Sequence, residues 1–125
     1  MKSIFITNQK GRCFICGKVG ATEKHHIFGG GMRDLSEKYG LTMHLCHDCH
    51  NEPPDGLHHN AERANKAKAF AQKAAMRRYK WSVEDFRKLF RKNYLSDNEI
   101  ETVMRSIEFD KKVEKKIEKE KAKCQ

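Results

Sequence analysis

Two Cys-x-x-Cys pairs constrain the fold of this chain more than any other feature. Cys13 and Cys16 form the first pair, Cys46 and Cys49 form the second, and residues 17–45 separate them. Four thiolates at such spacings are typical ligands of a closed tetrahedral zinc site. The segment between the pairs is too short to bury a large core, whereas zinc binding adds on the order of 10 kcal/mol of folding free energy. We therefore expect a structural zinc ion bound by all four cysteines.

Other ligand sets remain open at this stage. His47 or His50 could replace one of the thiols, and four free cysteines in a reduced protein are a further interpretation. The fifth cysteine, Cys124, lies in a charged tail, and we expect no role for it.

The charge of the chain indicates a polyanionic partner. Its 26 Lys and Arg residues outnumber its 17 Asp and Glu residues, for a net charge of +9. Nucleic acid is the first candidate for such a partner, although a basic protein with no such partner would have the same composition. No segment has the roughly 18 apolar residues that a membrane span needs. The apolar start of the chain soon meets polar residues, so we expect neither a signal peptide nor a membrane contact. We therefore expect a cytoplasmic location, where thiols stay reduced.

The region 1–60 is expected to form the core. Residues 1–12 are predicted as a short strand or arm, and strands are predicted within Ala21–Ile27 and Leu41–Leu45. The intervening segment, Phe28–Gly40, contains four glycines and no sustained periodicity. It is predicted to be a loop with one helical turn at its end.

The remainder of the chain is predicted to be helical. Asn60 is a suitable N-cap for a helix over Ala61–Lys80, and capping-box patterns at Ser82–Asp85 and Ser96–Glu99 predict two more helix starts. Phe70 and Met76 are expected in the core, and Trp81, Phe86, Leu89 and Phe90 are expected to pack the helices together. Residues 61–95 thus complete or pack on the core, and 96–125 form a charged helix or a frayed tail.

Two adjacent histidines lie near the end of the first predicted strand. Side chains of consecutive strand residues point to opposite faces, so His25 and His26 should have different environments. One can bind a metal ion while the other accepts a proton near neutral pH. Two exposed strand histidines are the simpler alternative. Glu23 shares a face with His25, where an ordinary strand carboxylate is favoured over one that orients a ligand.

These motifs, taken together, resemble a known enzyme family. Cys-x-x-Cys-Gly, Glu-Lys-His-His-Ile and Leu-Cys-x-x-Cys-His-Asn occur in this order within residues 11–60. This order is similar to that of the zinc-containing HNH endonucleases, and the Gly56-Leu-His-His-Asn60 segment resembles small phage and prophage members. The resemblance implies an α+β protein with a zinc-stapled ββα-metal core and a helical C-terminal extension. It also implies metal-dependent hydrolysis of DNA phosphodiester bonds to 3′-hydroxyl and 5′-phosphate ends.

The resemblance implies roles for several of the histidines. His26 matches the general base that activates the attacking water, and His25 and His50 match ligands of the catalytic divalent ion. His58 is the candidate that completes this ligand set, with His59 as its substitute. Mg²⁺ or Mn²⁺ is the expected ion, although imidazole-rich sites also accept Ni²⁺ or Zn²⁺.

One departure from the family pattern concerns an asparagine. The family has this residue several positions before the second cysteine pair, where this chain has Leu41-Thr-Met-His44. Asn51 or Asn60 could take its orienting role, and the sequence does not choose between them.

Basic side chains are expected to contact DNA phosphates without reading bases. The glycines at 29–31 precede one of them, and the first predicted helix carries the others; the candidates are Arg33, Lys66, Lys73, Arg77 and Arg78. A solvated helix face is the alternative for the helical residues. The competing function is a non-catalytic zinc module that binds nucleic acid, and a third is a protein-interaction adaptor. The oligomeric state stays open, with the C-terminal helix as a candidate for self-association or a protein contact.

Overall fold

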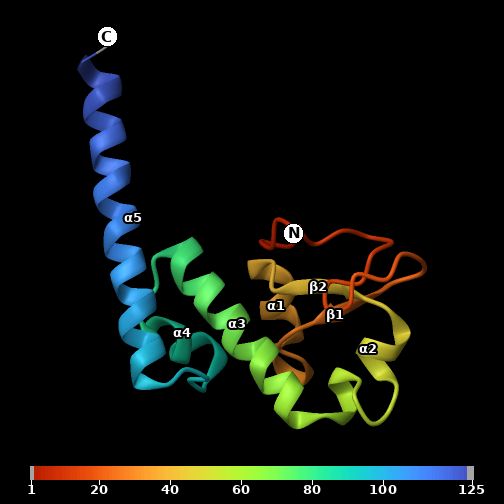
Figure 1. Ribbon diagram of the computed structural model, residues 1–125. Helices are drawn as coiled ribbons and strands as arrows, with labels where there is room; N and C mark the ends of the chain where they lie inside the picture. Colours follow the sequence, from red (N-terminus) through yellow and green to blue (C-terminus); the bar gives the residue numbers. More distant parts are fainter. Residues whose placement is uncertain (1, 124–125) are drawn as a thin grey trace.

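The computed structural model describes residues 2–123 and has an α+β fold, as predicted (Figure 1). Strand β1 (Glu23–His26) pairs antiparallel with β2 (Thr42–Leu45), so that His25 lies opposite Met43. Helices surround this hairpin and continue beyond it; their bounds are α1 Arg33–Tyr39, α2 His47–Asn51, α3 Ala61–Tyr79, α4 Val83–Phe90 and α5 Asp97–Lys123. Both strands lie inside the segments predicted for them.

The connection between the strands is more ordered than predicted. A 3-10 turn at Gly30–Met32 leads directly into α1, so the expectation of a loop with one helical turn was wrong. The reason is tertiary: the Ser36 hydroxyl, fully buried, accepts from the Phe28 N–H at 3.0 Å and donates to the Phe28 carbonyl at 2.8 Å. These bonds, with the partly buried Leu35, stabilise a helix whose sequence pattern is weak.

The N-terminal segment is an arm that packs along β2. It contains isolated bridges at Gln9–Arg12 and Arg12–Val19, so of the two predicted forms, strand or arm, the structure has the arm. The Asn8 carboxamide accepts from the His44 N–H at 2.7 Å, and the buried Phe5 ring lies against the core. The arm therefore covers the edge of the hairpin.

The long helix α3 connects the region of the hairpin to the C-terminal helices. As predicted, Asn60 caps it, and the Asn60 side chain accepts from the Arg63 N–H at 3.0 Å. Met76 is fully buried, as predicted, but Phe70 is 48% exposed, so the expectation that Phe70 lies in the core was wrong. Phe70 stacks on the ring of Phe5, which lies on the arm.

Two capping boxes start α4 and α5 where the sequence predicted them. Ser82 and Asp85 exchange hydrogen bonds at the start of α4, and Ser96 and Glu99 do so at the start of α5. The aromatic residues of α4 close the core beside the hairpin, where Phe86 and Phe90 lie 5.6 and 4.7 Å from the ring of Phe28; Trp81 and Leu89 are partly buried against the same cluster.

A buried polar contact fixes the loop between α4 and α5 to α3. The Gln72 side chain, which is fully buried, donates to the Asn93 carboxamide at 2.8 Å and accepts from the Tyr94 N–H at 2.7 Å. As a result α5 starts beside α3, and its C-terminal half extends away from the rest of the molecule (Figure 1). None of the helices within residues 2–123 is long and apolar enough to cross a membrane.

Gly40 is predicted to be essential for the joint between α1, the arm and β2. It has φ +72°, and a Cβ atom there would lie 2.6 Å from the Lys2 carbonyl oxygen. Gly30 is a matched control, because it has φ +57° and nothing within 4 Å of its Cβ position. In urea unfolding of the zinc-loaded protein, we expect Gly30→Ala to cost about 1 kcal/mol and Gly40→Ala about 1–3 kcal/mol more. Equal losses would contradict the steric argument.

Candidate metal centres

The four predicted cysteines come together at the open end of the hairpin, where β1 begins and β2 ends. Cys13 and Cys16 lie in a tight turn in which the Gly17 N–H donates to the Cys13 carbonyl at 2.9 Å. Cys46 is the N-cap of α2, and Cys49 lies within that helix. The four sulfur atoms all lie within 4.8 Å of one another. Cys124, for which no role was predicted, lies outside the described residues.

The geometry of this cluster fits a zinc ion. Tetrahedral coordination with Zn–S bonds of about 2.3 Å requires sulfur atoms about 3.8 Å apart. The Cys16 and Cys46 sulfur atoms are 3.7 Å apart, and the four cysteines form no disulfide. The cluster is consistent with a structural Zn²⁺ site.

Two thiols of this cluster, Cys13 and Cys49, have pKa values that are shifted in opposite directions. Burial raises the pKa of Cys13, but backbone N–H groups, including that of Cys16 at 3.5 Å, outweigh this effect and lower it to about 6. Burial and the neighbouring thiols raise the pKa of Cys49. A second thiolate is therefore unfavourable beside the first until a cation compensates the charge.

A second cluster consists of three of the predicted histidines. The ligand nitrogens of His25, from β1, His50, from α2, and His58, from the 3-10 turn Leu57–His59, lie within 4.8 Å of one another. The Nε2 atoms of His50 and His58 are 2.8 Å apart. Two nitrogens bound about 2.1 Å from one ion at a right angle would be about 3 Å apart, so this spacing fits a shared ion. His59 is not part of the cluster.

The environment of His25 supports the same conclusion. Its ring is buried, and its Nδ1 atom has no hydrogen-bond partner among the described residues. Burial, followed by repulsion from His50 and His58, lowers the pKa of His25 to about 4. The ring is therefore neutral at physiological pH, as a metal ligand must be.

Glu23 orients one histidine of the cluster. Its Oε1 atom accepts from His50 Nδ1 at 3.0 Å, and this hydrogen bond is the main cause of the lowered pKa of Glu23. A carboxylate that holds one ring nitrogen directs the other toward the metal site and increases its basicity. The contact with His50 agrees with the alternation that placed Glu23 on the face of His25, and a role for Glu23 in orienting a metal ligand stays a prediction.

His26 lies in a different environment from His25, as the strand alternation predicted. Its side chain is 15% exposed, and its Nε2 atom is 2.8 Å from Oε2 of Glu37, a residue of α1. Hydrogen bonds from Lys24 and His26 lower the pKa of Glu37 to about 2. Glu37 was not among the predicted site residues, because no local sequence pattern shows that this carboxylate lies next to His26, eleven residues earlier in the chain.

The two asparagine candidates have different surroundings. The Asn60 side chain accepts from Arg63 at 3.0 Å and contacts the Pro54 carbonyl at 3.5 Å, so it serves as a helix cap. Asn51 is exposed at the last residue of α2, one residue after His50. The orienting role of either residue stays a prediction.

The predicted DNA-contacting residues divide into two groups. Lys73 and Arg77 form ion pairs with Glu99 and Asp110 of α5. The second group consists of exposed side chains, those of Arg33, Lys66 and Arg78. Within it, Lys66 lies 3.5 Å from Glu62 of the same helix. DNA contact by either group stays a prediction.

Comparisons with protein-family models, curated proteins and solved structures found no match. The resemblance to the HNH endonucleases thus depends on the motif residues of this chain. What the structure adds is that these residues form two compact clusters suited to metal ions.

The cysteine cluster is predicted to hold one zinc ion per chain. Because four thiolates share one ion, Cys16→Ser should lose most of the bound zinc and the folded structure of the hairpin. Cys124→Ser, which changes the cysteine outside the cluster, should retain both. Native mass spectrometry and far-UV circular dichroism check this, and full zinc occupancy in Cys16→Ser would contradict the four-cysteine ligand set.

The histidine cluster is predicted to bind a second divalent ion. In zinc-loaded protein, calorimetric titration with Mn²⁺ should detect one site, and His58→Ala should weaken it at least about tenfold. His59→Ala is the control, since His59 lies in the same 3-10 turn but outside the cluster. Glu23→Gln should reduce the affinity by about 10- to 100-fold. Equal effects of His58→Ala and His59→Ala would contradict the assignment.

Proposed function

We propose that this protein is a metal-dependent DNA endonuclease of the HNH type. The observation that supports this most is the convergence of His25, His50 and His58 next to His26, which is hydrogen-bonded to the Glu37 carboxylate. A phage or prophage origin follows from the motif resemblance and is part of the same proposal.

His26 is the proposed general base, and its hydrogen bond to Glu37 assigns the proton-accepting nitrogen. Because the Glu37 carboxylate is ionised, it can only accept, so His26 Nε2 carries the proton of that 2.8 Å hydrogen bond. Nδ1 of His26 then has the free lone pair and can remove a proton from water. The imidazolium that forms is stabilised by Glu37, in the way that a carboxylate supports a general base in other hydrolases.

His25, His50 and His58 are the proposed ligands of Mg²⁺ or Mn²⁺, and Ni²⁺ or Zn²⁺ would also suit imidazoles. When bound, such an ion polarises a phosphate oxygen and stabilises charge on the leaving 3′ oxygen. Glu23 keeps the His50 ring in position for this task. The products would carry 3′-hydroxyl and 5′-phosphate ends.

DNA is the proposed partner because of the charge of the chain. The net charge of +9 favours phosphate contacts, and the exposed residues Arg33, Lys66 and Arg78 are the best placed to make them. A non-catalytic zinc module that binds nucleic acid has the same charge. It gives no task to the histidine cluster or to the pair formed by His26 and Glu37, and so it is the second candidate.

Cleavage of supercoiled plasmid tests the proposal. The zinc-loaded protein should nick DNA only when Mg²⁺ or Mn²⁺ is added, and His26→Ala should lower the rate by about 10²- to 10⁴-fold, since it removes the base. His59→Ala should keep the activity, because His59 is exposed and outside the cluster. Both variants should retain zinc and fold. Salt-sensitive DNA binding without cleavage of plasmid, branched or single-stranded DNA would favour the non-catalytic module.

A further inference from the structure

The C-terminal half of α5 carries an unpartnered apolar stripe. Phe109, Val113 and Ile117 are 64%, 39% and 48% exposed, and they recur every four residues along the helix. This half of α5 extends away from the rest of the molecule (Figure 1). Three large apolar side chains in a row on such a helix are unfavourable in water.

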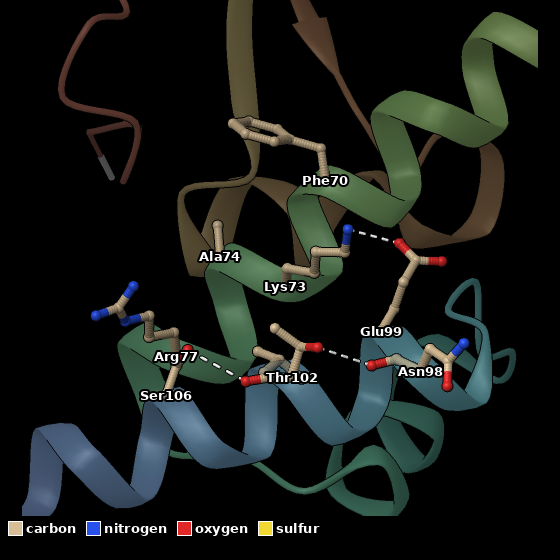
Figure 2. Close-up of a pocket in the computed structure, with 9 residues that line it drawn as sticks. Phe70, Lys73, Ala74, Arg77, Asn98, Glu99, Thr102 and Ser106 are labelled. Carbon is tan, nitrogen blue, oxygen red and sulfur yellow. Dashed lines mark hydrogen bonds and ion pairs between the residues drawn. The ribbon is translucent and has the colours of Figure 1, made fainter.

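The N-terminal half of α5 borders a groove instead. A groove of about 640 Å³ lies between α3 and α5, and Phe70, Ala74 and Val103 supply its apolar surface. Figure 2 shows the short side chains of Thr102 and Ser106 along its α5 side, and the ion pair of Lys73 with Glu99 across it. Short side chains on α5 and an exposed ring on α3 leave space there for side chains of another helix.

The stripe and the groove lie on the same face of α5. With about 3.6 residues per turn, the groove residues Asn98, Thr102 and Ser106 lie within about 100° of the stripe residues around the helix axis. One half of this face therefore presents large apolar side chains, and the other half presents small ones beside a groove.

We propose that this face binds a second copy of the same chain, with the two α5 helices antiparallel. A two-fold axis beside residues 107–108 would place Phe109 opposite Ser106, Val113 opposite Thr102 and Ile117 opposite Asn98 of the other copy. The stripe of each chain then fills the groove of the other. Because each chain supplies one stripe and one groove, both contacts form within a single pair of chains, and the assembly is a closed dimer.

The charges along α5 favour a second copy over another occupant. In an antiparallel pair, one edge of α5 lies against the same edge of α5 from the other copy. This arrangement brings Glu101 close to Lys112 and Lys116 of the other copy. The stripe itself lies among both acidic and basic residues.

Sedimentation equilibrium of the zinc-loaded full chain tests this proposal. We expect a monomer–dimer equilibrium with the dimer dominant at about 100 µM protein. Val113→Glu should weaken the dimer at least about tenfold, because it places a charge in the groove of the other copy. Met104→Glu is the matched control, since Met104 is also apolar and 37% exposed on α5 but faces the opposite side, and its dimer should match the unchanged protein.

The register is tested by a complementary pair of variants. Thr102→Lys alone should also weaken the dimer, whereas an equimolar mixture of Thr102→Lys and Val113→Glu should recover it, because the introduced ammonium and carboxylate groups then lie opposite each other. Circular dichroism should be unchanged in all variants. A monomer at about 100 µM, equal effects of Val113→Glu and Met104→Glu, or no recovery in the mixture would each overturn the proposal. The readout is mass rather than cleavage, so it does not depend on the proposed nuclease function.

Discussion

The convergence of four cysteine sulfurs within 4.8 Å is the constraint on which the rest of the structure depends. The strands of the hairpin have only four residues each, and a two-stranded hairpin of that length is marginal in water. The cysteine pairs flank this hairpin and connect the turn at Cys13 to the start of α2. Because His50 directly follows Cys49, the cysteine cluster also positions one member of the histidine cluster.

Two carboxylates hold histidines in the two different environments on either side of β1. Glu23 holds His50 on the side of His25, and Glu37 holds His26. The alternation of the strand separates the two environments, so the buried ring of His25 stays neutral while His26 keeps a hydrogen bond to an ionised group. One short strand thereby supplies both a candidate metal ligand and a candidate base.

Local signals predicted the helical half of the chain well. The cap at Asn60 and the boxes at Ser82 and Ser96 are short-range hydrogen-bond patterns, so they could be read from neighbouring residues. Helix α1 could not, because the buried bonds of Ser36 to Phe28 stabilise it across eight residues of chain. Phe70 was misplaced because an apolar residue on α3 has no local mark that distinguishes a core face from a groove.

The sequence by itself indicated the cysteine and histidine residues that are candidate metal ligands, together with the helix starts, since ligand types, spacings and caps are local chemical properties. Tertiary structure alone decided that Glu37 reaches His26 and that Lys73 and Arg77 pair with α5. It also places His58, which the sequence favoured over His59, beside His25 and His50. These contacts join residues from different elements, and their distances depend on how the hairpin, α1 and the C-terminal helices pack. Spacing along the chain carries no information about such packing.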